Sequence, residues 1–375
     1  MIQPGRVVSH LASIGVDMYT GVPDSLLKEF GKHVMAELPR DQHIIAANEG
    51  ASVGIALGHY LKTGRPALVY LQNSGFGNTV NPLLSLADAD VYGVPMLLMV
   101  GWRGQPGVKD EPQHVKQGRV MTALLDALEL PWAVLPHETD AAEACLTEAV
   151  KQAEEGSTPY VILVEKDTFA AAEVTPDEGA AGDLSSREDA LRALARAVGD
   201  EAIIVSTTGM LSRELFEHRE AAGESGARDF LTVGGMGHAS SIALGVAKQE
   251  ADREVWCFDG DGALLMHLGT LAVIADHGPA NYLQVVFNNG VHDSVGGQPT
   301  SIDAVDIPAI ALAAGYRHAE AVHDLADVAG AVERLRDAGG PSLLELRVRP
   351  GNRPGIGRPT RTPAQSKETF MDAVR

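Results

Sequence analysis

Two glycine-containing polar turns follow two successive apolar segments in the second half of the chain. Gly260-Asp261-Gly262-Ala263 follows a strand-like segment, residues 254–258, and Asn288-Asn289-Gly290 follows another, residues 282–287. Residues 264–277 have helical periodicity, so the pattern predicts two parallel strands joined by a crossover helix. Both turns should then lie at the carboxyl edge of an α/β sheet, where such sheets bind ligands.

The residues of these turns suit a hard cation and a diphosphate. Asp and Asn supply the oxygen ligands that Mg²⁺ prefers, and glycines let backbone amides approach phosphate at a helix N-terminus. Gly-Asp-Gly alone is ordinary turn chemistry. The prediction therefore depends on the order strand, turn, helix, strand, turn.

The rest of the chain repeats this α/β pattern. Strands are expected near residues 43–47, 67–72, 96–101 and 160–165, and again near 202–207, 254–258, 282–287 and 342–348. Residues 170–186 are small, acidic and contain Pro and Gly, which is typical of a linker. We therefore expect two α/β domains with parallel sheets, residues 1–169 and 187–375, joined by that linker.

Composition excludes several classes of function. The net charge of −20 argues against nucleic acid and anionic membranes as partners. The longest apolar runs, such as residues 95–101, are far too short to span a membrane, and the N-terminus lacks a signal-peptide core. Two cysteines, Cys145 and Cys257, make no disulfide framework, so we expect a cytoplasmic protein.

The two turns together resemble the GDG…NN fingerprint of the thiamin diphosphate-dependent decarboxylases. The resemblance implies thiamin diphosphate and Mg²⁺ as cofactors, one domain for the aminopyrimidine and one for the diphosphate, without the third, central domain of larger members. It also implies a homodimer or higher oligomer with active sites between subunits. The metal ligands would be Asp261, Asn289 and the carbonyl of Val291. Asn288, 27 positions after Asp261, is the alternative to Asn289, which is 28 positions after it.

The cofactor requires a carboxylic acid beside its pyrimidine ring, in an apolar pocket that keeps the acid protonated. Glu49 follows the strand-like residues 43–47 and opens a segment rich in small residues. The segment Asn48-Glu49-Gly50 resembles the activating segment of the family, which makes Glu49 the activating acid. The alternative is an ordinary pair of residues at a helix N-terminus.

Two further segments are candidates for cofactor contact. In residues 233–245 the resemblance implies that Met236 supports the bent cofactor and that the carbonyl of Gly234 accepts from its amino group, although most methionines are core residues. Thr207 and Thr208 follow a strand and could donate to the diphosphate, although Thr-Gly is also common in turns. The proposed cofactor-binding set is Glu49, Thr207, Thr208, Gly234, Met236, Gly260, Asp261, Gly262, Ala263 and Asn289.

Several segments resemble one branch, the phosphonopyruvate decarboxylases, with the sulfopyruvate decarboxylases as neighbours. They are residues 20–25, 101–104, 110–118, 288–300 and 349–359. The branch implies decarboxylation of 3-phosphonopyruvate to phosphonoacetaldehyde in phosphonate biosynthesis. Asp24, Ser25 and His114 are candidates for both catalysis and substrate binding, and Asp24 or His114 could supply the product proton. The other substrate candidates are Lys116, His292, Gln298, Arg353 and Arg358.

Charge supports part of this prediction. A phosphonate needs cations, and residues 347–361 contain five arginines and no acid (Arg347, Arg349, Arg353, Arg358 and Arg361). A solvated basic tail explains the same run about equally well. Both His114 and His292 could transfer a proton near neutral pH.

Three other functions compete with this prediction. A sulfopyruvate decarboxylase, or another 2-oxoacid decarboxylase on the same scaffold, differs only in the substrate contacts. A non-catalytic cofactor-binding subunit should lack the activating acid, whereas Glu49 is present. A Rossmann oxidoreductase should carry G-x-G-x-x-G after its first strand, which is missing here.

Overall fold

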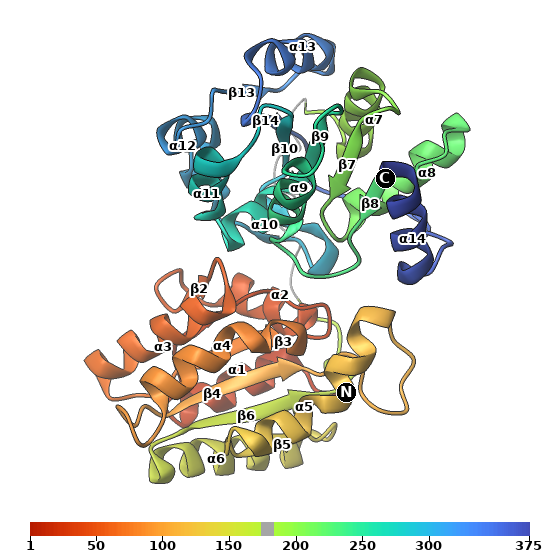
Figure 1. The fold of residues 1–375 in the computed structure, drawn as a ribbon. Coiled ribbons are helices and arrows are strands. Elements are labelled where there is room, and N and C mark those ends of the chain that lie inside the picture. Colours follow the sequence, from red (N-terminus) through yellow and green to blue (C-terminus); the bar gives the residue numbers. More distant parts are fainter. Residues whose placement is uncertain (174–183) are drawn as a thin grey trace. The chain divides into compact units, whose positions relative to one another are not determined.

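The computed structural model describes residues 1–173 and 184–375, which form two compact units, Met1–Asp177 and Glu178–Arg375 (Figure 1). Residues 174–183 of the expected linker lie outside the described residues, so the limits of the linker stay a prediction. The flanks of the linker are tied to their own units. Ala170 donates to the carbonyl of Ile2, and Arg349 donates to the carbonyl of Ser185.

The first unit is a six-stranded parallel sheet with strand order β2-β1-β3-β4-β6-β5. Its strands are β1 (Tyr19–Gly21), β2 (His43–Ile45), β3 (Leu68–Gln72), β4 (Met96–Gly101), β5 (Trp132–Val134) and β6 (Pro159–Val164). The helices are α1 (Pro4–Ser13), α2 (Lys28–Glu37), α3 (Glu49–Thr63), α4 (Phe76–Pro82), α5 (Pro112–Ala127) and α6 (Thr139–Gly156), with η1 (Asn73–Gly75) and the π-helical η2 (Leu83–Ala87) between α3 and α5.

Alternating side chains of these strands enter two separate cores. In β3, Leu68 and Tyr70 pack into one core, and Val69 and Leu71 pack into the other. Helices α1, α2 and α6 contribute to the first core, whereas α3 and α5 contribute to the second. Because both faces are covered, the inner strands β4 and β6 are buried along their whole length and do not alternate with polar residues.

The second unit has the same plan, with strand order β13-β14-β10-β9-β7-β8 in a parallel sheet. Its strands are β7 (Ile203–Ser206), β8 (Asp229–Leu231), β9 (Val255–Gly260), β10 (Tyr282–Asn288), β13 (His318–Val322) and β14 (Ser342–Arg347), and β11 (Val291–His292) pairs with β12 (Gln298–Pro299) in a separate antiparallel ribbon. The helices are α7 (Arg187–Val198), α8 (Met210–Ala222), α9 (Ala239–Ala247), α10 (Asp261–Met266), α11 (Thr270–His277), α12 (Ile307–Ala314), α13 (Val328–Ala338) and α14 (Pro363–Val374), and three short 3-10 turns complete the unit: η3 (Asp293–Val295), η4 (Ile302–Ala304) and η5 (Leu325–Asp327).

The expected fold class is confirmed, with two differences in detail. Strands β1, β5, β8 and β13 were not predicted, because three of them are only three residues long and β13 is interrupted by His318 and Glu320. The crossover expected as one helix is two, α10 and α11, separated at residues 267–269. Gly269 lies in this break, and glycine weakens helix interiors. Among the described helices, none is long and apolar enough to cross a membrane.

Candidate functional site

The two polar turns of the second unit lie side by side, as predicted. Gly260 is the last residue of β9 and Asn288 the last of β10. The two strands are parallel neighbours, and Phe287 is in register with Gly260. Asp261 and Asn289 therefore follow adjacent strands at one edge of the sheet.

Asp261 is a buried carboxylate held by neutral donors. Asp261 is only 2% exposed, and its Oδ2 accepts a hydrogen bond from the hydroxyl of Thr300 at 2.6 Å. The carboxylate also accepts backbone N–H groups, including that of Asn289. Burial raises the pKa of Asp261 to about 6, because a charged carboxylate is disfavoured away from water. A cation beside this group would offset that cost.

The two asparagines have different surroundings. Asn288 is buried and donates to Oε1 of Glu345 at 2.7 Å, so its amide faces the sheet interior. Asn289 contacts Asp261 through its backbone, and its Oδ1 accepts the N–H of Val291 at 3.2 Å. A carbonyl oxygen has a second lone pair that can bind a cation. Oδ1 of Asn288 likewise accepts one backbone N–H, that of Gly290 at 3.1 Å, so the choice of Asn289 as the ligand stays a prediction.

The donor set fits a hard cation. Within residues 1–173 and 184–375, no group of three or more His, Cys, Asp and Glu side chains gathers as a metal cluster. A cation at this edge would instead take the Asp261 carboxylate, the Asn289 amide oxygen and the carbonyl of Val291. Such an all-oxygen set with one carboxylate is what Mg²⁺ uses when phosphate and water complete its shell.

Gly262 lies between two other predicted residues. A Cβ atom at Gly262 would lie 2.8 Å from Cε1 of His292 and 3.3 Å from Cε of Met236. A Cβ at Gly260, by contrast, would meet no atom within 4 Å, so this turn is open on that side. The start of α10 is thus surrounded by Gly262, Met236 and His292. The side chain of Thr207, another predicted cofactor contact, hydrogen-bonds to the buried carboxylate of Asp259.

Two histidines expected to transfer protons have lowered pKa values. Burial lowers the pKa of His292 to about 4. Burial and the nearby Arg103 guanidinium lower the pKa of His114 in the first unit. Both imidazoles should therefore be neutral at pH 7. His292 is opposite Gln298 in the β11–β12 ribbon, where Gln298 is only 3% exposed.

In the first unit, Glu49 opens α3 and turns its carboxyl inward. Asn48 caps the helix by accepting the N–H of Ala51 at 2.9 Å, so Glu49 is not needed as the cap. The Glu49 residue is 6% exposed, and Oε2 accepts from Nδ2 of Asn78 at 2.7 Å. A Cβ atom at Gly75 would lie 2.0 Å from Oε1. Burial raises the pKa of Glu49, which is the property expected of the activating acid.

A second cluster in this unit brings Asp24, Ser25 and His114 together. Asp24 follows β1, is 1% exposed and accepts from Nε2 of Gln72, and burial raises its pKa. The Arg103 guanidinium donates to Oγ of Ser25 at 2.8 Å. His114 is buried, and its Nδ1 has no hydrogen-bond partner among the described residues.

Arg103, the positively charged residue of this cluster, was not predicted from the sequence. Arg103 donates from Nε to Oδ2 of Asp110 at 2.8 Å, and its backbone is tied to the side chain of Asn73 at 2.8 and 3.1 Å. Both Arg103 and Asp110 lie in segments that resemble the phosphonopyruvate decarboxylases, and this resemblance was the sequence signal that could have identified them. Lys116, in contrast, is exposed on α5.

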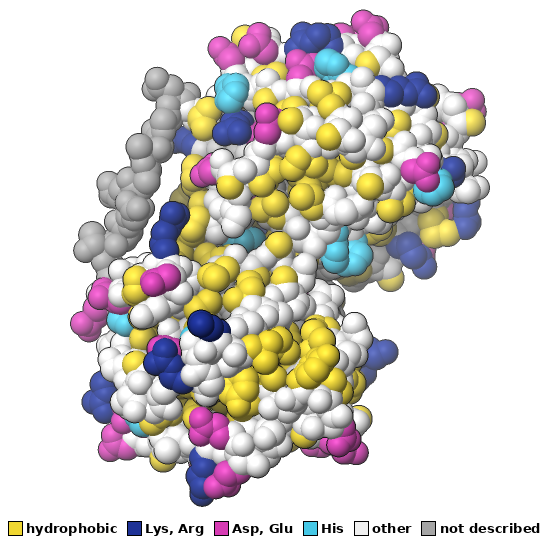
Figure 2. Space-filling model, turned by 90° about the vertical axis from the view of Figure 1, so that its left-hand side faces the viewer, with side chains coloured by type: hydrophobic (Ala, Val, Ile, Leu, Met, Phe, Trp, Pro, Cys, Tyr) yellow, Lys and Arg dark blue, Asp and Glu magenta, His cyan; other side chains and the backbone are white. Residues whose placement is uncertain are grey.

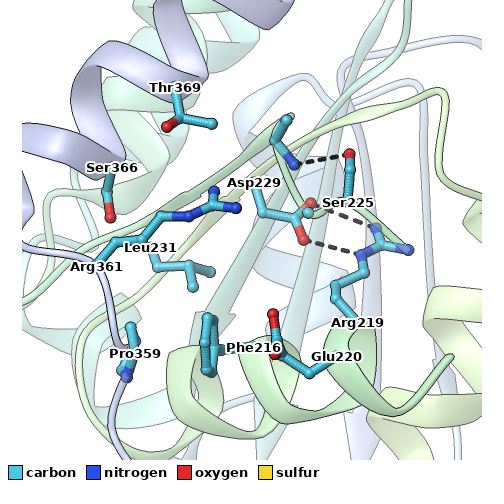
Figure 3. A pocket seen from close by; sticks show the side chains of 12 residues that line it. Phe216, Arg219, Glu220, Ser225, Asp229, Leu231, Pro359, Arg361, Ser366 and Thr369 are labelled. Atoms are coloured by element: carbon cyan, nitrogen blue, oxygen red, sulfur yellow. Dashed lines mark hydrogen bonds and ion pairs between the residues drawn. The ribbon is translucent and has the colours of Figure 1, made fainter. Parts of the chain in front are cut away.

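The arginine-rich segment is distributed over the second unit. Arg353 donates to Oε2 of Glu188 at 3.1 Å and also to Glu217. Arg361 lines a pocket between α8, β8 and α14 (Figure 3), and none of the predicted site residues lines that pocket. Arg358 is exposed. Arg353 is thus paired with acids of its own unit.

Comparisons with known proteins identify the family. The thiamine pyrophosphate enzyme models match this chain twice, the N-terminal TPP binding domain at residues 6–130 and the C-terminal TPP binding domain at residues 207–346. A phosphonopyruvate decarboxylase of Streptomyces viridochromogenes is 36% identical, covering 100% of this chain and 95% of that protein. One from Streptomyces hygroscopicus is 34% identical, covering 99% and 94%. A sulfopyruvate decarboxylase of Methanosarcina acetivorans is 27% identical, covering 98% and 97%.

Each domain match lies within one of the two units, and each unit contains some of the candidate residues described above. The chain therefore belongs to the thiamine pyrophosphate enzymes, in the family that contains the phosphonopyruvate decarboxylases.

Proposed function

We propose that this protein decarboxylates 3-phosphonopyruvate to phosphonoacetaldehyde with thiamin diphosphate and Mg²⁺, as a step of phosphonate biosynthesis. The observation that carries the proposal is the buried Glu49 carboxyl in a chain that aligns from end to end with phosphonopyruvate decarboxylases. A non-catalytic cofactor-binding subunit would have no use for a carboxyl whose burial raises its pKa, so an active enzyme is favoured.

Residues of the second unit would hold the diphosphate and the cation. Thiamin diphosphate, when bound, supplies a nucleophilic carbon and stores the electron pair left by departing carbon dioxide. Asp261, Asn289 and the Val291 carbonyl would bind Mg²⁺ through oxygen. The other proposed cofactor contacts in this unit are Thr207, Thr208, Gly234, Met236, Gly260, Gly262 and Ala263.

In the first unit, Glu49 would hold a proton at the pyrimidine ring. The amide of Asn78 binds one carboxyl oxygen, so the other can carry the proton. The cluster of Asp24, Ser25 and His114 would contact the substrate. Arg103, whose Nη1 reaches Ser25 while Nε and Nη2 pair with Asp110, would supply its guanidinium. Because burial raises the pKa of Asp24, this carboxyl suits the proton that replaces the lost carboxylate. The other proposed substrate contacts are Lys116, His292, Gln298 and Arg358.

Sulfopyruvate is the second candidate substrate, because a sulfopyruvate decarboxylase also aligns over 98% of this chain. Sulfonate and phosphonate differ by one charge, so the half-buried Arg103 matters more for phosphonate. With thiamin diphosphate and Mg²⁺, the purified protein should have a kcat/KM for phosphonopyruvate at least about tenfold higher than its kcat/KM for sulfopyruvate. This difference corresponds to roughly 1.4 kcal/mol. Aldehyde formation from each substrate measures this. A preference for sulfopyruvate would show that the protein is instead a sulfopyruvate decarboxylase.

Two arginines allow a matched test of the substrate contacts. Arg103→Lys keeps a positive charge but loses the guanidinium fork, and we expect it to raise the KM for phosphonopyruvate about tenfold. Arg353→Ala should leave KM within about twofold, because Arg353 is paired with Glu188 and Glu217, whereas Arg103 reaches the candidate residue Ser25 as well as its partner Asp110. Steady-state kinetics, with circular dichroism to check folding, distinguishes the two. If KM rose in Arg353→Ala and not in Arg103→Lys, the phosphonate would instead be bound by the arginine-rich segment, residues 347–361.

We also infer a homodimer or higher oligomer, working in the cytoplasm, with active sites between subunits. Exposed apolar side chains lie in and beyond η2 of the first unit: Leu84, Leu86, Val91 and Tyr92. On α3, Cβ atoms added to Gly54 and Gly58 would meet nothing within 4 Å, so this helix offers an open, close-approach surface. Figure 2 shows hydrophobic side chains gathered on a face of this unit. Such patches commonly mark protein interfaces.

A further inference from the structure

Asp293 is the meeting point of three segments of the second unit. Its Oδ2 accepts from Nδ2 of Asn289 at 2.7 Å and from Nη1 of Arg187 at 2.8 Å. The N–H of Gly351 donates to the same carboxylate, at 3.0 Å to Oδ1. Asp293 thus joins the start of α7, the turn after β10 and the arginine-rich segment after β14.

Arg187 lies buried between two carboxylates. Its side chain is 7% exposed, and Nε and Nη2 donate to Glu214 of α8, each at 2.9 Å. The Glu214 side chain is 1% exposed. Burying ion pairs of this kind adds little net stability, because desolvation offsets the attraction. Such a network is better explained by what it positions.

The group that it positions is the amide of Asn289. A side-chain amide rotates as one planar unit, so fixing its NH₂ group fixes the direction of its oxygen. Asp293 holds the NH₂, and Val291 donates to Oδ1 at 3.2 Å. These two bonds set the direction of the remaining lone pair of Oδ1, and the backbone N–H of the same residue donates to the Asp261 carboxylate.

We propose that Asp293 and Arg187 are positioning residues for the cation site, with Asp293 orienting the Asn289 amide oxygen and Arg187 holding Asp293. This inference rests on the proposed Mg²⁺ site at Asp261 and Asn289. Partners that orient a metal ligand typically contribute 10–100-fold to metal affinity.

The segment after β14, residues 349–353, connects Asp293 to helices α7 and α8. Gly351 donates to Asp293, while Arg353 is paired with Glu188 of α7 and with Glu217 of α8. Ser186, next to Arg187, forms an isolated parallel bridge with Arg349. The arginine-rich segment thereby holds the metal turn in place, a role that does not require contact with the substrate.

Asp293→Ala tests the proposal against Asp293→Asn, which keeps an acceptor oxygen. Mn²⁺ binding to the protein with thiamin diphosphate, followed by electron paramagnetic resonance, measures the metal Kd without relying on turnover. We expect Asp293→Ala to raise this Kd about 10–100-fold, and Asp293→Asn to raise it less than about threefold. Saturating metal should restore cofactor affinity in both variants.

Asp229→Ala is the matched control, because it removes a buried carboxylate from another arginine pair of this unit, that with Arg219, without touching Arg187 or Asn289. It should lower the melting temperature and leave the metal Kd unchanged. An unchanged Kd in Asp293→Ala, with normal metal binding in the wild type, would overturn this inference alone. Absence of metal binding in the wild type would instead overturn the proposed metal site.

Discussion

Glu49→Gln should nearly abolish turnover while leaving thiamin diphosphate bound. Glutamine keeps the shape of the side chain and can still accept the N–H of Asn78, but it has no proton to give. General acid–base groups typically contribute 10²–10⁴-fold, so we expect kcat to fall by about that range. Steady-state kinetics measures the loss, and isothermal titration with the cofactor at saturating Mg²⁺ should return a near-normal Kd.

Two further variants separate the chemistry of Glu49 from its structural role. Glu155→Gln, at an exposed position of α6, makes the same chemical change and should leave kcat unaltered. Gly75→Ala keeps the carboxyl but displaces it, because the new Cβ would lie 2.0 Å from Oε1, and kcat should fall here too. Near-normal turnover of Glu49→Gln would remove this residue from the mechanism.

The parts of the fold that were predictable are those whose signal is local. β4 is a continuous apolar run, and β9 and β10 are mainly apolar, because both sheet faces are covered; such runs are visible without a structure. Strands β1 and β8 contain three residues each and carry no periodicity to detect. The turns at Asp261 and Asn289 were recognisable because their spacing follows from two strands and a crossover.

The contacts that complete the site were not predictable, because they join residues far apart in the chain. Asn78 is 29 positions from Glu49, and Arg187 is 106 positions from Asp293. The arginine-rich segment contains no acid of its own, so its charge seemed available for substrate. Glu188 and Glu217, 165 and 136 positions from Arg353, neutralise that residue in the fold.

Asp261→Ala should abolish the Mg²⁺ dependence of cofactor binding. Asp261 supplies the single carboxylate of the proposed oxygen set, so its loss should cost more than the roughly 10–100-fold expected for an outer partner. Thermal melting provides the measurement. Mg²⁺ with thiamin diphosphate should raise the Tm of the wild type, since ligands that bind only the folded state stabilise it. The same addition should leave the Tm of Asp261→Ala unchanged.

The metal-free Asp261→Ala protein should still fold, and its pH dependence provides an internal check. Burial raises the folded-state pKa of Asp261 to about 6, above the value of 3.8 for an exposed carboxyl. The wild type without metal therefore loses stability as pH rises from about 4 through 6, because the charged form is disfavoured when buried. Asp261→Ala should lack this contribution. A Tm rise with Mg²⁺ and cofactor equal to that of the wild type would exclude Asp261 as a metal ligand.

The two asparagines complete this test, because they differ in what they contact. Asn289→Ala should behave like Asp261→Ala, since Asn289 offers its amide oxygen beside the carboxylate. Asn288→Ala should lower stability by removing one of the partners of the buried Glu345, whose Oε1 keeps Arg347 Nε at 2.9 Å, a loss of about 0.5–1.5 kcal/mol, yet keep the response to Mg²⁺. The reverse pattern would assign the second ligand to Asn288, and would also remove the reason for Asp293 to orient its neighbour.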